Sequence, residues 1–108
     1  MPIELKAPLS AYYEAGNAHD ADKVAALFGE TALVHDENAD HRGRAAIRNW
    51  AQHTYDKYNI ALIPREARRE AGVTFITTGV VGTFPGSPIE LQFRFITDGD
   101  RIEELTIG

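Results

Sequence analysis

The stretch IELQFRFITDGDRIEELTI, residues 89–107, decides how this chain folds. Its first half alternates the apolar residues Leu91, Phe93 and Phe95 with polar ones, which is the period of a strand that buries one face. The pair Asp98-Gly99 then favours a tight hairpin, because glycine accepts a positive φ. The sequence therefore predicts two antiparallel strands joined by a short turn.

Two more strands are predicted upstream of this hairpin. Residues 73–84 are rich in Val, Thr, Phe and Ile, and they complete a three-stranded meander with the two strands that follow. Ile60–Ile63 begins another strand, but Pro64 and the charged run at residues 65–70 disfavour a simple continuation. These charges suit a sheet edge, where they prevent unwanted pairing, and their spacing also suits a turn of helix.

Helical spacing of apolar residues dominates the first part of the chain. Residues 3–28 divide into two helical segments, and Asp20 is well placed to cap the second one. Gly29 is expected to end that helix. A short strand at residues 33–35 and a polar loop at residues 36–42 come next.

A third helix is predicted after Gly43. Its inward face would contain Ile47, Trp50, Ala51, Thr54 and Tyr58, with Trp50 as the largest buried side chain of the helix. Three helices followed by a strand meander indicate an α+β fold.

The composition limits both the size and the partners of the protein. A chain of 108 residues with 44% hydrophobic residues builds one core, so residues 1–108 are expected to form a single domain. A formal net charge of -5 and the lack of a basic stripe argue against nucleic acid as a partner. The sequence has no cysteine and no long apolar run, so we expect no zinc-thiolate site, no membrane span and a cytoplasmic location.

Three segments and their order resemble one known superfamily. Residues 12–28, YYEAGNAHDADKVAALF, resemble its opening helices, residues 42–48, RGRAAIR, resemble the start of its third helix, and residues 93–102 resemble its terminal hairpin. This is the nuclear transport factor 2-like superfamily, which includes ketosteroid isomerases and SnoaL-like polyketide cyclases. The resemblance spans nearly the whole chain. It implies a cone-shaped, curved antiparallel sheet with three N-terminal helices, a cystatin-like roll around a small apolar pocket.

The same resemblance implies two catalytic residues. In ketosteroid isomerases an aspartate at the end of the first strand moves the proton, and a tyrosine of the first helix stabilises the oxyanion. Counting from the shared helical turn places Asp36 and Tyr12 at these positions. Leu91 falls where the isomerases carry a second acid, and its neighbour Glu90 points to the other face of the strand. One oxyanion donor of the isomerases is therefore missing.

A small hydrophobic molecule is the ligand that such a pocket would hold. The predicted ligand-binding side chains are mainly apolar, and they are Trp50, Leu91, Phe93, His35, Phe28 and Phe75. Each has a plainer interpretation as core packing, and Asp36 also suits a role as hydrogen-bond acceptor for the loop that follows it.

The histidines and carboxylates near Asp36 raise the question of a metal. His35, Asp36, Glu37, Asp40 and His41 are residue types that bind zinc or iron. Adjacent strand residues point to opposite faces, and no HxH or HExxH spacing brings two imidazoles together. We therefore predict no metal site and no cofactor.

Two hypotheses for function remain open at this stage. In the first, Asp36 moves a proton next to a carbonyl group, as an isomerase, cyclase or dehydratase does, and Tyr12 stabilises the enolate. In the second, the chain is a non-catalytic module that binds a small ligand or forms a dimer. A homodimer through the outer sheet face, with Gln92 and Arg94 in the interface, is expected from the resemblance.

Overall fold

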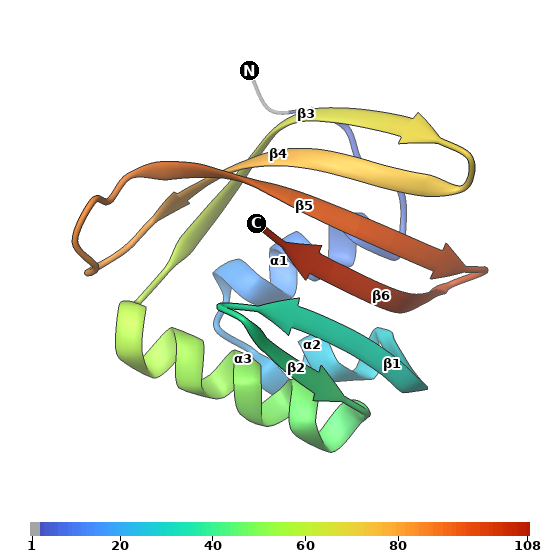
Figure 1. Cartoon of the computed structure of the whole chain (residues 1–108), viewed down its shortest axis with the longest axis horizontal. Helices are drawn as coiled ribbons and strands as arrows, with labels where there is room; N and C mark the ends of the chain where they lie inside the picture. Colours follow the sequence, from blue (N-terminus) through green and yellow to red (C-terminus); the bar gives the residue numbers. More distant parts are fainter. Residues whose placement is uncertain (1–2) are drawn as a thin grey trace.

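A curved sheet wrapped around three helices forms the molecule (Figure 1). The computed structural model describes residues 3–108 of the domain expected over 1–108. The elements in chain order are α1 (Leu9–Asn17), α2 (Ala21–Ala26), β1 (Phe28–Asp36), β2 (Ala39–Arg42), α3 (Arg44–Tyr58), β3 (Ala61–Glu70), β4 (Val73–Val81), β5 (Ile89–Asp98) and β6 (Arg101–Ile107).

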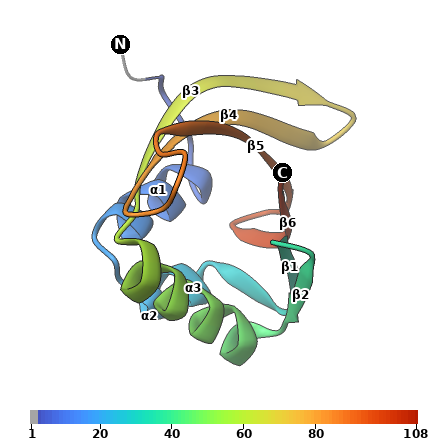
Figure 2. The same ribbon diagram turned by 60° about the vertical axis from the view of Figure 1, so that its left-hand side comes forward.

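The six strands form one sheet in the order β2-β1-β6-β5-β4-β3. All neighbours are antiparallel except β1 and β6, which run parallel to each other. Figure 2 shows that the sheet bends around the helices without closing, so β3 lies over α1 while β1 and β2 lie beside α3. The predicted α+β fold with a curved sheet and three helices is confirmed, and the parallel β1–β6 pair is the one departure from an antiparallel sheet.

The boundary between α2 and β1 differs from the prediction. Asp20 does cap α2, since its Oδ1 accepts a hydrogen bond from the Lys23 amide at 3.1 Å. The helix ends at Ala26, however, and Gly29 lies inside β1. A side chain at Gly29 would collide with the carboxylate of Glu103, so this glycine admits a close neighbour rather than ending a helix.

A hairpin replaces the predicted loop at residues 36–42. β1 and β2 pair from Leu33–Arg42 to Asp36–Ala39, and the turn between them consists of Glu37 and Asn38. Both turn residues have positive φ, 52° and 63°, as two-residue hairpins of this twist require. The hairpin fixes Asp36 as the last residue of β1.

The charged segment after Ile63 continues the strand at the sheet edge. β3 extends to Glu70 and pairs only with β4, so the edge position is confirmed and the helical alternative is wrong. The register shifts between Pro64 and Glu66, which accommodates a residue without a backbone N–H.

The core lies between the concave face of the sheet and the helices. Its most deeply buried large side chains come from α2, α3 and four of the six strands, and they are Phe28, Phe95, Ile47, Ile76, Ile102, Leu105, Val24 and Val34. None of the helices in residues 3–108 is long and apolar enough to cross a membrane.

Candidate functional site

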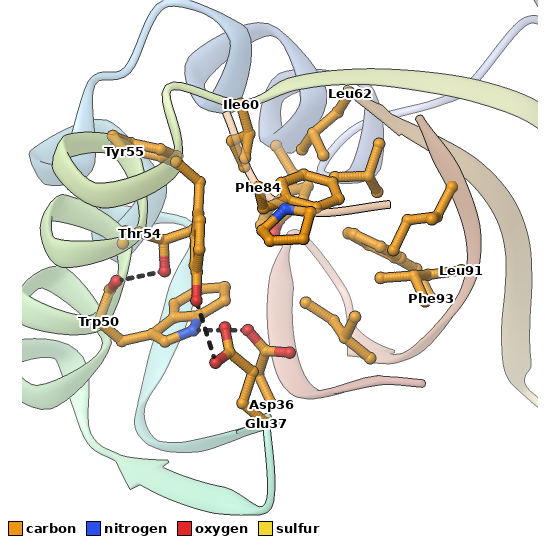
Figure 3. Close-up of a pocket in the computed structure, with 17 residues that line it drawn as sticks. Asp36, Glu37, Trp50, Thr54, Tyr55, Ile60, Leu62, Phe84, Leu91 and Phe93 are labelled. Atoms are coloured by element: carbon orange, nitrogen blue, oxygen red, sulfur yellow. Dashed lines mark hydrogen bonds between the residues drawn. The ribbon is translucent and has the colours of Figure 1, made fainter. Parts of the chain in front are cut away.

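One end of the concave face remains open as a cavity of about 480 Å³ (Figure 3). That volume lies in the range of small-molecule sites. The lining comes from α1, α3, the sheet and the loop after β4, and consists of Tyr12, Asp36, Glu37, Trp50, Ala51, Thr54, Tyr55, Tyr58, Ile60, Leu62, Val80, Phe84, Pro85, Ile89, Leu91, Phe93 and Ile107. Most of these side chains are apolar, so the cavity is a candidate ligand site with few polar groups.

Asp36 is one of the two carboxylates in this lining. Strand alternation places it on the same face of β1 as the fully buried Val34, which turns it toward the helices. Its Oδ2 accepts a hydrogen bond from Nε1 of Trp50 at 3.1 Å. Figure 3 shows the other carboxylate oxygen directed toward the side of the cavity where Leu91 and Phe93 lie.

The surroundings of Asp36 change its acidity. Burial raises the pKa of this carboxyl above its ordinary value, and the nearby Glu37 carboxylate adds to the effect. The hydrogen bond from Trp50, a backbone hydrogen bond at Glu37 and the proximity of His41 lower the pKa in part. Within residues 3–108, Asp36 has no ion-pair partner. A carboxylate in this setting is a stronger base than one in water.

Tyr12 approaches the cavity from α1. It is 3% exposed and packs edge-on against the rings of Phe28 and Phe95. Burial raises its pKa well above 10, with smaller contributions from Tyr55, Tyr13 and Asp36. The phenol therefore stays protonated near neutral pH, where it can donate a hydrogen bond to a ligand in the cavity.

Trp50 lies in a different environment from the one predicted. The side chains that bury the core face of α3 are Ile47, Ala51 and Tyr55, while Trp50 is only partly buried. It lies on the adjoining helical face, beside Asp36, with the ring of His41 on its other side at a centroid distance of 6.1 Å. The expectation that Trp50 would be the largest buried side chain of this helix is wrong, because its N–H needs a polar partner.

The sheet side of the cavity contains Leu91 and Phe93 of β5. Glu90 points to the outer face, where its carboxylate lies 3.3 Å from Nε of Arg65. The strand therefore has no bulge that would turn Glu90 inward, and the position where ketosteroid isomerases carry a second acid is apolar.

Three residues predicted to bind a ligand lie outside the cavity lining. Phe28 is fully buried and packs against Tyr12. Phe75 points to the outer face of β4, where the guanidinium of Arg68 lies 4.5 Å from its ring centroid. His35 faces outward from β1 and contacts Asp40 of β2 at 2.5 Å. Strand alternation explains the placement of His35 and Phe75, since their neighbours Val34 and Ile76 occupy the inner face.

The cavity lining also contains residues that are not among the site residues predicted above. Tyr55 and Tyr58 come from the end of α3, Glu37 from the turn after β1, and Phe84 from the loop after β4. The hydroxyl of Tyr58 donates to Oε2 of Glu37 at 3.4 Å, and its ring meets that of Phe84 edge-on at 5.8 Å. The sequence indicated the position of Tyr58, because the four-residue spacing of Trp50, Thr54 and Tyr58 puts it on the predicted inward face of the helix.

Gly82 allows the loop after β4, which contains Phe84, to approach the end of α3 closely. A Cβ atom on Gly82 would lie 2.6 Å from the carbonyl oxygen of Tyr58, so only glycine fits at this crossing. The amide of Thr83 then donates to the same carbonyl at 2.7 Å. This contact holds the loop against the end of α3 and places Phe84 beside the cavity.

The carboxylates and imidazoles near β1 do not converge. Within residues 3–108, no group of three or more His, Cys, Asp or Glu side chains is arranged to hold a metal ion. His41 and His53 line a separate crevice on the far side of Trp50, which shares Asp36 and Glu37 with the cavity.

Comparison with known proteins gives a family match. The family model for the SnoaL-like domain matches residues 9–104. A search of curated proteins gives no match. Among solved structures, a Sinorhizobium meliloti protein provisionally assigned as a polyketide cyclase has 30% identity and a TM-score of 0.89, with 93% of this chain and 92% of that chain covered.

More distant structures share the fold. A protein of ketosteroid isomerase-like fold from Catenulispora acidiphila, solved in complex with trimethylamine, has 20% identity and a TM-score of 0.82, covering 95% of this chain and 86% of that one. An epoxide hydrolase/cyclase-like enzyme of pyran ring formation in salinomycin has 18% identity and a TM-score of 0.78, with coverage of 92% and 84%. At these identities the likeness shows the fold alone.

Proposed function

Because the chain belongs to the SnoaL-like domain family of the nuclear transport factor 2-like superfamily, we propose that it is an enzyme that moves a proton next to a carbonyl group of a small apolar substrate. The observation that carries this proposal is the setting of Asp36. Its carboxylate lines an apolar cavity, is held by Trp50 and lacks a cationic partner among residues 3–108. Tyr12, a protonated hydrogen-bond donor, lines the same cavity.

The proposed step is an enolisation. Asp36 takes a proton from the carbon next to the carbonyl, the C–H bond breaks, and its electron pair moves to the carbonyl oxygen. Tyr12 donates a hydrogen bond to the resulting enolate oxygen. Return of the proton to another carbon completes an isomerisation, whereas attack of the enolate carbon on a second electrophile in the same substrate completes a cyclisation. Trp50 holds one oxygen of Asp36, and the other oxygen, which is directed into the cavity, would take the proton.

The apolar Leu91 narrows the choice of substrate. With one side-chain donor in place of two, the enolate receives less stabilisation, and the loss of one such donor typically costs about 100-fold or more in rate. Substrates with an already acidic C–H bond, such as 1,3-dicarbonyl compounds, depend least on the missing donor. The proposed function therefore favours cyclisation or isomerisation of activated ketones over that of simple steroids.

The experiment is deuterium exchange into an activated apolar ketone. 2-Tetralone in D2O loses its α-proton signal in the proton NMR spectrum when a base removes that proton. We expect the wild-type chain to accelerate the exchange, and Asp36→Asn to abolish the acceleration. Glu90→Gln is the matched control, because it removes a carboxylate from the outer face. Equal exchange rates for the wild type and Asp36→Asn would contradict the proposal.

A non-catalytic binding module is the second candidate, and the apolar Leu91 is the observation that favours it. A cavity with a single oxyanion donor and aromatic walls also suits storage or transport of an apolar ligand. This candidate would be supported over the enzyme if an apolar ligand binds saturably while the chain does not accelerate proton exchange, either in 2-tetralone or in a 1,3-dicarbonyl compound, above the rate in buffer alone.

We also propose that two copies associate through the outer face of the sheet. Gln92 and Arg94 lie there beside the partly buried Phe75, and the exposed Ile63 and Val81 lie on the same side of β3 and β4. Light scattering should give the mass of a dimer, and Phe75→Lys should give that of a monomer. A monomeric wild type at micromolar concentration would contradict this proposal.

A further inference from the structure

The charge of the cavity lining is entirely negative. The ionisable groups with a negative form are Asp36 and Glu37, and none of the lining residues is Lys, Arg or His. Neither carboxylate forms an ion pair with a residue in the range 3–108. An anionic ligand would meet two like charges in a setting of low polarity, whereas a cation would supply the missing partner.

Aromatic rings make up a large share of the same lining. A ring face carries partial negative charge and attracts ammonium groups, most strongly for Trp and Tyr. The rings that line the cavity come from four separate parts of the chain, and they are Tyr12, Trp50, Tyr55, Tyr58, Phe84 and Phe93. Tyr12 and Tyr55 do not add negative charge near neutral pH, because burial raises the pKa of Tyr55 to about 12 and that of Tyr12 well above 10.

The two carboxylates lie side by side in the cavity. Figure 3 shows Asp36 and Glu37 together beside Trp50, with Leu91 and Phe93 on another side and Ile60 and Leu62 at the opposite end. A ligand with a positive head and an apolar body would match this division. It would place the head at the carboxylates and the body against the sheet.

The basic residues nearest to the cavity are not part of its lining. His41 and His53 face Asp36 and Glu37 from the adjoining crevice beyond Trp50. Lys57 lies 5.1 Å from the ring centroid of Tyr58 and is not part of the lining. None of these groups therefore occupies the space in which a ligand would bind.

We propose that the cavity takes a small apolar amine in its ammonium form, with Asp36 as counter-ion and the aromatic rings around its alkyl groups. The inference rests on the proposed function only in requiring that the cavity hold a ligand. Binding of the cation favours the ionised form of Asp36, so affinity rises as the pH increases through the pKa of that carboxyl. The other titratable groups that face Asp36 are Glu37 in the cavity and His41 and His53 in the adjoining crevice.

Three probes of similar shape test the sign of the charge. Phenyltrimethylammonium, tert-butylbenzene and benzenesulfonate each carry a phenyl ring and a tetrahedral head, with charges of plus one, zero and minus one. Trp50 is the only tryptophan of the chain and lines the cavity, so its fluorescence reports binding. At pH 7.5 we expect the cation to bind about tenfold more tightly than the neutral probe, and the sulfonate not to bind.

Two acidic residues and one control locate the effect. Asp36→Asn should remove the preference for the cation while retaining the neutral probe, and Glu37→Gln should reduce the preference. Glu90→Gln should keep the full tenfold ratio, because it removes the same charge from the outer face. If Asp36→Asn does not fold, Glu37→Gln and the loss of preference at acidic pH in the wild type test the same point.

The outcomes separate this inference from the proposed catalysis. Equal or weaker binding of the cation, no binding of any probe, or a preference that survives in both acidic variants would overturn it. Exchange of 2-tetralone, a neutral ketone, is measured without any cation. A cation preference without exchange would therefore refute only the catalytic proposal, and exchange without the preference would refute only the amine.

Discussion

Acidic side chains have basic partners on the outer face of the sheet, whereas Asp36 on the inner face has none within residues 3–108. On the outer face, Oε2 of Glu90 lies 3.3 Å from Nε of Arg65, and Oε1 of Glu104 lies 3.5 Å from Nη1 of Arg94. On the inner face, Asp36 receives a hydrogen bond from Trp50 and has no cationic partner within residues 3–108. Ion pairs at the surface contribute little to stability, so their presence outside indicates ordinary surface chemistry.

The difference supports the proposal that the function of the protein lies on the inner face. A partly buried carboxylate without a counter-ion costs free energy that packing elsewhere must offset. The core supplies that stability through residues such as Phe95 and Ile102, which are fully buried against the helices. The comparison predicts that changes to the polar side chains of the cavity alter activity more than stability, and that changes to the ion pairs of the outer face alter neither strongly.

The largest expected effect is that of Asp36→Asn. Loss of the base should lower the exchange rate roughly 10³-fold. The free energy of unfolding should not decrease at pH 7, because the substitution removes an ionised group from a partly buried position. Exchange NMR and urea denaturation on the same samples give the two quantities. A parallel loss of stability and activity would mean that Asp36 is a structural residue.

The contribution of Asp36 to the free energy of unfolding depends on pH in a predictable direction. The pKa of Asp36 is raised in the folded chain, so its favourable contribution is fully present below the ordinary pKa of an aspartate. That contribution is lost as the pH rises through the raised pKa. The wild type should therefore gain stability relative to the variant as the pH falls through this interval, which denaturation at a series of pH values measures.

Tyr12→Phe should have the next largest effect. The hydroxyl is removed while the edge-on packing against Phe28 and Phe95 is retained. Loss of one oxyanion donor should lower the exchange rate about 100-fold with little change in substrate affinity. Tyr13→Phe is the matched control, because the Tyr13 hydroxyl bonds Thr78 at 2.7 Å and Tyr13 does not line the cavity. A larger loss of rate in the control would contradict the role assigned to Tyr12.

Strand alternation was the part of the fold and site that the sequence predicted best. The period of two in residues 89–97 placed Leu91 and Phe93 inward and Glu90 outward, as the structure has them. It also predicts that His35 and Asp36 face opposite sides, which conflicts with the expectation that His35 binds a ligand and agrees with its contact to Asp40. Alternation alone leaves the face of Phe75 open, because apolar residues occur on both sides of β4.

Features that depend on tertiary contacts were not predictable in the same way. The hairpin at Glu37 and Asn38 requires two consecutive residues with positive φ, and no local sequence pattern indicated this. The position of Phe84 depends on the approach of its loop to α3 at Gly82. The partial burial of Trp50 depends on the hydrogen bond from its Nε1 to Asp36, which joins elements that are separate in the sequence.

Trp50→Phe should have a moderate effect on activity. The substitution keeps an aromatic ring and removes the N–H that lowers the pKa of Asp36. The acidic limb of the pH–rate profile should move to higher pH, with a rate loss of about tenfold or less at its plateau. Thr54→Val is the control, since the Thr54 hydroxyl lines the cavity but donates to a backbone oxygen. An unmoved acidic limb would show that Trp50 does not tune this carboxyl.

The smallest effect is expected for Glu90→Gln on the outer face. Its ion pair with Arg65 joins side chains that are 61% and 48% exposed, so solvent and salt screen the attraction. The free energy of unfolding should change by less than about 1 kcal/mol, and the change should disappear at high salt. Urea denaturation at low and high ionic strength measures both. A larger, salt-independent loss would mean that the outer face also depends on its charges, and the contrast with the unpaired Asp36 would no longer point to function.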